Sequence, residues 1–365
     1  METIVSVKEI FNTFEYESCT DLLETIRSHL CYKKGGVKFC INLLDDLIAS
    51  KNDKGLQYGD ILEFQGPYGS GKRHLLYFIA STTLLPKVYE SNDKKEVIGG
   101  LEEGIVLLDC SRKWQTFRLE EIMYEKIKNI FKKNQNNTIN EKDDAESKNK
   151  IIKNIIKESL SRLYIFRPEN SISLIATLKY LPHYFKSYAN DLKIRYVFLD
   201  SISAFYWKDR YSDLLSNSSL QEQINIIYKR ITQLLKKFCY TWCSLAISTN
   251  WVLQVSQNFN PYTTDIRYFT ISEDSFQIYH HHLPLSYTSQ VSHRICFLRK
   301  AVAQFSPGID LENLLIYSQQ RNNILQLGLY LAVLQRLSNK DLAPSKRTGF
   351  IFRITKDNVQ IEKYL

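Results

Sequence analysis

The chain has no long hydrophobic run, no dense basic block and no metal-type cysteine spacing. No apolar run approaches the roughly 20 residues of a membrane-spanning helix, and the first residues lack the basic-then-apolar order of a secretory signal. We therefore expect no membrane partner. The seven cysteines contain no CxxC pair, which argues against a cysteine zinc site and favours free buried thiols in a reducing compartment.

The charge is positive but spread thinly. The net charge is +9 over 365 residues, and no run of Lys and Arg is longer than two residues, as at 132–133 and 236–237. This balance is compatible with an anionic partner such as nucleic acid, but it does not require one. Hydrophobic residues make up 44% and aromatics 13%, which is ample for a packed core of one large or two small domains.

A phosphate-binding loop is the clearest motif. Residues 66–73 read GPYGSGKR and match the pattern G-x-x-x-x-G-K, but Arg73 follows where Ser or Thr is usual. An apolar strand at 61–64 enters the loop, and an apolar helical pattern at 74–80 leaves it. Such a junction directs backbone N–H groups and a helix dipole at a polyphosphate. We predict that ATP is bound by Gly66, Pro67, Tyr68, Gly69, Ser70, Gly71, Lys72 and Arg73.

Strand and helix patterns alternate along the chain. Continuous apolar runs, typical of buried parallel strands, occur at 61–64, 104–109, 163–166, 196–200 and 242–248. Helical patterns occur at 117–131, 171–180 and 220–238, and strand character returns at 293–298. This alternation predicts an α/β fold, with a mostly parallel sheet flanked by helices on both faces.

Segments outside that alternation suggest the organisation of the domain. Residues 1–50 are expected to form a helical lead-in to a core that covers 51–365. Polar and charged residues dominate 132–150, which predicts a disordered surface insertion. Residues 255–290 are expected to form an irregular loop region, with their three adjacent histidines in a loop instead of a metal site. Strand patterns at 350–354 and 359–361 predict a closing β-hairpin.

The residues for hydrolysis are incomplete. Asp200 ends an apolar strand, where nucleotide hydrolases place a carboxylate that holds Mg²⁺ through water. Turnover also needs a hydroxyl on the metal and a group that orients the attacking water. Arg73 replaces that hydroxyl, and Ser111 stands where a catalytic Glu is expected. Two interpretations of Arg73 stay open: its guanidinium neutralises the phosphate directly, or it fills the site and excludes magnesium.

These motifs resemble the eukaryotic recombinase paralogues of the RecA superfamily. The strand and loop at 61–73, together with LLPK at 84–87, form the first part of the resemblance. The sequence LDSISAFYWKDR at 199–210 is more specific, and it is similar to the X-ray repair cross-complementing protein two subgroup. The resemblance runs with gaps from about residue 18 to residue 300.

The resemblance implies a RecA-like P-loop ATPase core that acts in homologous recombination in the nucleus. Relatives join other recombinase paralogues in hetero-complexes, in some lineages with a SWIM-type zinc protein. These complexes assist the main strand-exchange recombinase on single-stranded or branched DNA. The resemblance further implies that the loop 66–72 lies near a partner.

The chain also departs from the family. Trp251 stands where the recombinases have a Gln that senses the γ-phosphate, and the region 255–290 lacks the dense basic pattern of a DNA-binding loop. We therefore predict an accessory subunit that binds nucleotide with weak or no hydrolysis. The alternative is an active DNA-dependent ATPase that tolerates Arg73. A small-molecule kinase would need a second site of clustered Arg and Asp, which is not found. For the aromatic run 205–207, packing or an interface is favoured over base stacking.

Overall fold

The computed structural model describes ten parts of the chain. They are residues 56–91, 94–134, 143–188, 193–211, 220–252, 282–299, 308, 310–335, 349–355 and 359–364. The predicted lead-in at 1–50 and the predicted irregular region up to residue 281 lie outside these described residues.

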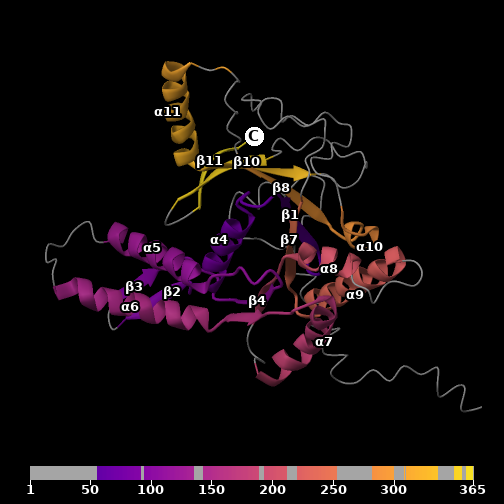
Figure 1. Ribbon diagram of the computed structural model, residues 1–365. Coiled ribbons are helices and arrows are strands. Elements are labelled where there is room, and N and C mark those ends of the chain that lie inside the picture. Colours follow the sequence, from indigo (N-terminus) through magenta and orange to yellow (C-terminus); the bar gives the residue numbers. More distant parts are fainter. Residues whose placement is uncertain are drawn as a thin grey trace, which may run out of the picture.

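A single large sheet forms the centre of the molecule (Figure 1). In spatial order its strands are β11 (Val359–Tyr364), β10 (Gly349–Ile354), β9 (Leu329–Gln335), β8 (His293–Arg299), β1 (Ile61–Gly66), β7 (Leu245–Trp251), β6 (Ile194–Asp200), β4 (Gly104–Asp109) and β5 (Leu163–Phe166). Neighbours from β8 to β5 are parallel, whereas β8–β9, β9–β10 and β10–β11 are antiparallel. The predicted α/β fold and the C-terminal hairpin are confirmed.

Helices cover both faces of the sheet. One face packs against α4 (Lys72–Leu84), α5 (Thr116–Asn134) and α6 (Asp143–Leu160). The other face packs against α7 (Ser171–Tyr188) and α9 (Leu220–Thr241), with the short helices α8 (Tyr206–Arg210) and α10 (Leu285–Thr288) beside them. A small hairpin of β2 (Val88–Ser91) and β3 (Lys94–Val97), the turn η1 (Ile202–Ala204) and helix α11 (Leu311–Leu327) complete the described elements.

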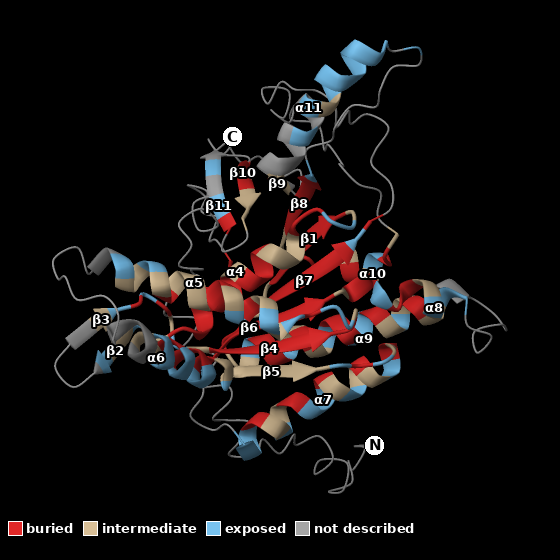
Figure 2. Ribbon diagram, turned by 60° about the vertical axis from the view of Figure 1, so that its left-hand side comes forward, coloured by how far each residue is buried: buried red, intermediate tan, exposed pale blue. Residues whose placement is uncertain are grey.

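The strand sequences explain why two layers of helices are needed. Successive side chains of a strand point to opposite faces, so Leu107 and Phe198 join the core under α4 while Val106 and Leu199 join the core under α9. The central strands are therefore buried on both faces (Figure 2). Their continuous apolar runs are the sequence signature of this burial.

Two local predictions need correction. The expected disordered insertion at 132–150 is helical at both ends, since α5 continues to Asn134 and α6 begins at Asp143. The polar start of α6 is held because the helix continues into Ile152, Ile155 and Ile156, whose spacing of three to four residues buries one stripe against the core. Strand β7 begins at Leu245 instead of residue 242, because α9 extends to Thr241 and a turn follows it.

Of the four cysteines among the described residues, three follow expectation. Cys110, Cys239 and Cys296 are free and buried, as predicted. Cys243 forms a disulfide, so the prediction is wrong for that residue. None of the described helices is long and apolar enough to cross a membrane.

Candidate nucleotide-binding site

The loop 66–73 joins β1 to α4, as the sequence predicted, and glycine is required at both ends of it. Gly71 precedes the helix with φ of 89°, a left-handed conformation that residues with a side chain rarely adopt. A Cβ on Gly66 would lie 2.5 Å from the carbonyl oxygen of Phe297. Gly66 therefore has to be glycine because a neighbouring backbone lies too close for a Cβ, and Gly71 because of its positive φ.

The loop presents a set of donors suited to an oxyanion. No described residue accepts a hydrogen bond from the backbone N–H groups of Gly69, Ser70 or Gly71, and no side chain caps the start of α4. A helix N-terminus with open N–H groups attracts negative charge. These residues therefore fit the phosphate chain of a nucleotide, which would be held by the loop N–H groups together with the two cationic side chains that follow.

Lys72 lies folded back over the loop. Its Nζ donates to the carbonyl oxygens of Gly66 at 2.6 Å and Pro67 at 2.8 Å, and to Ser70 Oγ at 3.1 Å. Burial lowers the pKa of Lys72 to about 7; Asp200 opposes this shift and Arg73 adds to it. A bound phosphate would replace these three neutral acceptors with anionic oxygens and favour the charged form of the amine.

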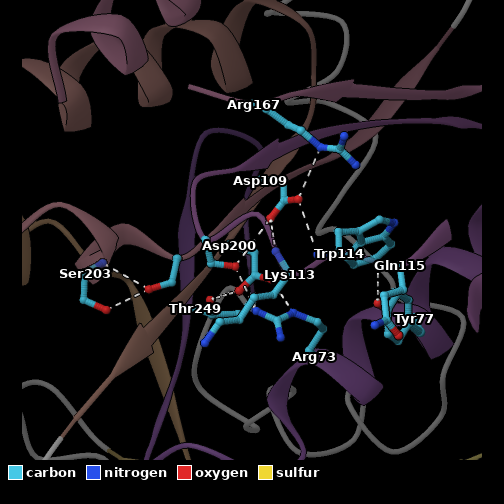
Figure 3. Close-up of polar contacts among 12 residues, drawn as sticks. Arg73, Tyr77, Asp109, Lys113, Trp114, Gln115, Arg167, Asp200, Ser203 and Thr249 are labelled. Atoms are coloured by element: carbon cyan, nitrogen blue, oxygen red, sulfur yellow. Dashed lines mark hydrogen bonds and ion pairs between the residues drawn. The ribbon is translucent and has the colours of Figure 1, made fainter. Parts of the chain in front are cut away.

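Arg73 links three elements at the carboxyl end of the sheet (Figure 3). Its Nε donates to Asp200 Oδ2 at 2.6 Å, and its Nη2 donates to Ser111 Oγ at 2.9 Å. Asp200 ends β6, and Ser111 lies two residues beyond the end of β4. Although burial opposes it, the pairing with Asp200 raises the pKa of Arg73, so the guanidinium stays charged.

The site does not fit the magnesium ion that the fold family implies. Both carboxylate oxygens of Asp200 are engaged, because Oδ2 accepts from Arg73 and Oδ1 accepts from Thr249 Oγ1 at 2.6 Å. The hydroxyl that would bind the ion directly is replaced by the guanidinium itself. Asp200 thus lies beside the loop, as predicted, but the position that would take the metal is occupied by a cation of the protein.

The second carboxylate of the site is also engaged. Asp109 is fully buried and accepts hydrogen bonds from the backbone N–H groups of Lys113 at 3.2 Å and Trp114 at 3.3 Å. Arg167 adds an ion pair at 3.6 Å. These contacts hold the segment after β4 in place instead of leaving a carboxylate free to orient water. Neither Asp109 nor Asp200 is available as a general base in this arrangement.

The end of β7 departs from the recombinase pattern, in which a Gln senses the γ-phosphate. Asn250 is buried, and its Nδ2 donates to Glu63 Oε1 at 2.8 Å inside the sheet. Trp251 is 41% exposed, and its backbone N–H donates to Ser203 Oγ at 2.9 Å. The side-chain amide of Asn250 is thus engaged by Glu63, and Trp251 has no side-chain amide with which to relay a phosphate contact.

The sequence did not reveal two hydrogen bonds of the site, the one that Ser111 accepts from Arg73 and the one that Thr249 donates to Asp200. Ser111 and Thr249 each supply a hydroxyl, but Ser111 lies just beyond β4 and Thr249 lies on β7, and neither hydroxyl belongs to a motif. The packing interpretation of the aromatic run is confirmed for Phe205 and Tyr206, which are buried in the core, while Trp207 stacks against His282 at 5.9 Å. Among the described residues, no cluster of His, Cys, Asp and Glu could hold a metal ion.

The parallel sheet, its two helical layers and the loop between β1 and α4 define a RecA-like α/β core with a phosphate-binding loop. No protein-family model matches the chain. The chain is 26% identical over 180 residues to the DNA repair protein XRCC2 of Mus musculus, an alignment that covers 48% of the chain and 53% of the mouse protein. It is 22% identical over 284 residues to the DNA repair protein XRCC2 homolog of Arabidopsis thaliana, covering 72% of the chain and 75% of the plant protein.

The fold, the motifs and these alignments support an XRCC2-like paralogue of the RecA superfamily, at low sequence identity. The alignment spans about half the length of the mouse relative.

Proposed function

We propose that this chain is an accessory DNA-repair protein in homologous recombination, a subunit of a recombinase-paralogue complex in the nucleus. In that complex it assists the strand-exchange recombinase on single-stranded or branched DNA. Its loop binds ATP through residues 66–73 with weak or no hydrolysis. The relatives that carry the name DNA repair protein support the process, and the departures within the loop support the accessory role.

One observation carries the proposal most directly: the ion pair between Arg73 and Asp200. It fills the position where a hydrolase would hold its metal, and Ser111, which accepts from the same guanidinium, stands where a catalytic Glu is expected. A site without metal or base loses most of the stabilisation of a phosphoryl-transfer transition state. The phosphate-binding half of the loop is nevertheless complete, so binding is retained while turnover is lost.

The alternative is an active DNA-dependent ATPase. It is favoured by Lys72 and the loop glycines, which keep the geometry that a working phosphate-binding loop needs. It requires that Arg73 move away from Asp200 when nucleotide and DNA are bound.

Survival after DNA crosslinking tests the proposed process. Cells would carry the wild-type gene, a deletion, Lys72→Ala, or Arg112→Ala as a control, because Arg112 is an exposed cation whose partner Glu169 is also exposed. We expect the deletion to be sensitive and the control to match the wild type. A deletion as resistant as the wild type would remove the recombination assignment.

ATP turnover by the purified complex separates the two functions. If the chain is an active ATPase, DNA should stimulate ATP hydrolysis, and Lys72→Ala should abolish that hydrolysis. If the chain is an accessory subunit, no such Lys72-dependent hydrolysis is expected.

In the survival assay, rescue by Lys72→Ala at normal protein level would mean that nucleotide binding is dispensable. Sensitivity of that variant would mean that the loop still acts.

A further inference from the structure

The guanidinium of Arg73 is only partly used by its protein partners. A guanidinium carries five N–H donors in one plane. Nε and one hydrogen of Nη2 bond Asp200 and Ser111, and no described residue accepts from Nη1 or from the second hydrogen of Nη2. The side chain is 26% exposed, whereas Asp200 is 3% exposed. The group is thus anchored on its protein side and has open donors on the other.

The surroundings of the loop add positive charge. Lys72 directs its amine into the loop, and the Nζ of Lys113 lies 4.9 Å from the ring centroid of Tyr68, an exposed residue of the same loop. Asp200 is the carboxylate paired with Arg73, so it neutralises one cation and leaves the amines of Lys72 and Lys113 uncompensated beside the loop. A triphosphate that has not already been neutralised by a metal matches this excess of cations.

We propose that Arg73 is a resident cation that takes the place of Mg²⁺, so that the loop binds metal-free nucleoside triphosphate and disfavours the magnesium complex. The proposal rests on the nucleotide binding proposed above. Arg73 neutralises Asp200 and presents its open N–H donors to phosphate oxygens, the two electrostatic tasks that a bridging divalent ion performs in an ordinary loop. A magnesium ion brought in with the nucleotide would meet the guanidinium of Arg73 and a carboxylate whose two oxygens already accept hydrogen bonds.

The proposal determines the direction in which added Mg²⁺ changes the affinity for nucleotide. In an ordinary phosphate-binding loop, Mg²⁺ strengthens nucleotide binding because the ion bridges the phosphates to protein oxygens. In this chain, excess Mg²⁺ depletes the free triphosphate and repels the guanidinium. The affinity is therefore expected to fall, or to stay level, as Mg²⁺ is added.

The experiment is a titration of a fluorescent ATP analogue into the full-length protein, in complex with its partners if it requires them, once with excess EDTA and once with excess Mg²⁺. The wild type is expected to bind with equal or higher affinity in EDTA. Arg73→Thr restores the usual hydroxyl and frees Asp200, so it is expected to bind at least about tenfold more tightly in Mg²⁺ than in EDTA. Arg112→Ala is the matched control, since it removes an arginine outside the loop and should follow the wild type.

The outcomes separate this inference from the proposed function. Wild-type binding that is about tenfold tighter in Mg²⁺ than in EDTA would overturn the inference even if Arg73→Thr failed to fold, because the wild-type measurement stands alone. Equal magnesium dependence of the wild type and Arg73→Thr would overturn it too. If the wild type binds no nucleotide under either condition, the inference and the nucleotide-binding half of the proposed function both fail. The recombination role would still be decided by survival of the deletion strain.

Discussion

Two arginine–carboxylate pairs lie on neighbouring parts of the same sheet, and they differ in burial. Arg294 of β8 donates through Nε to Glu63 of β1, and these side chains are 2% and 0% exposed. Arg73 of α4 donates to Asp200 of β6, and there the arginine is 26% exposed. The first pair joins two neighbouring strands and is buried, whereas the second joins the end of β6 to the first turn of the helix that follows the phosphate-binding loop.

The difference in burial distinguishes a structural pair from the pair that we propose contacts nucleotide. Glu63 also accepts from Asn250, so the inner cluster ties β8, β1 and β7 together through side chains that water does not reach. Removing one partner there would leave a buried charge unpaired. Arg73 can be reached by solvent on one side and keeps open donors. The same chemistry therefore holds strands together in one place and offers a site in the other.

Replacing Arg294 is expected to cause the largest effect. Arg294→Met leaves the carboxylate of Glu63 buried without its cation, and we expect a loss of about 3–5 kcal/mol in the free energy of unfolding. Urea denaturation followed by circular dichroism measures it. The double variant Glu63→Leu with Arg294→Met removes both charges and should recover much of that loss. A single variant within about 1 kcal/mol of the wild type would contradict the structural role of the pair.

Replacing Arg73 at the loop should lower the free energy of unfolding by less than replacing Arg294. Arg73→Thr removes the cation beside Asp200, but Thr249 still donates to that carboxylate and the site opens to water. We expect a loss of about 1–2 kcal/mol in the same denaturation experiment. If Arg73→Thr destabilises the protein as much as Arg294→Met does, the two pairs are of one kind and the comparison fails.

Nucleotide affinity should depend on pH through Lys72. Burial lowers its pKa in the free protein to about 7 against the opposing attraction of Asp200, and a bound phosphate is expected to raise that pKa again. The affinity is thus fully present below pH 7 and is lost as the pH rises toward the pKa of the complex, by about fivefold between pH 7 and pH 8. The titration above, repeated across pH, measures this effect. Lys72→Arg stays charged, so its affinity should show no such fall, and a parallel fall in both proteins would assign the pH effect to another group.

The smallest effect is expected at Ser111. Ser111→Ala removes one hydrogen bond to Arg73 Nη2 and leaves the ion pair with Asp200 intact. We expect a stability change of about 1 kcal/mol or less and no magnesium requirement for nucleotide binding. A magnesium requirement in Ser111→Ala would show that the serine, and not Asp200, anchors the guanidinium.

Much of the fold could be predicted because its signals are local. The runs at 104–109 and 163–166 correspond to β4 and β5 as observed, and the patterns at 196–200 and 293–298 lie within β6 and β8. Each central strand is buried on both faces, so its apolar run is continuous and easy to recognise. Helix α6 was missed as a whole, because its first residues are polar and the isoleucines that pack it against the core follow only later in the helix.

The sequence by itself determined the loop between β1 and α4, since glycines and a lysine at fixed spacing shape a phosphate-binding turn through backbone geometry alone. It left the role of Arg73 open. Only the tertiary structure decided which groups the guanidinium contacts, because its two partners lie 127 and 38 residues away, at the ends of other strands. Parallel strands place their carboxyl ends at one edge of the sheet, and it is this convergence, absent from any local pattern, that pairs Arg73 with Asp200.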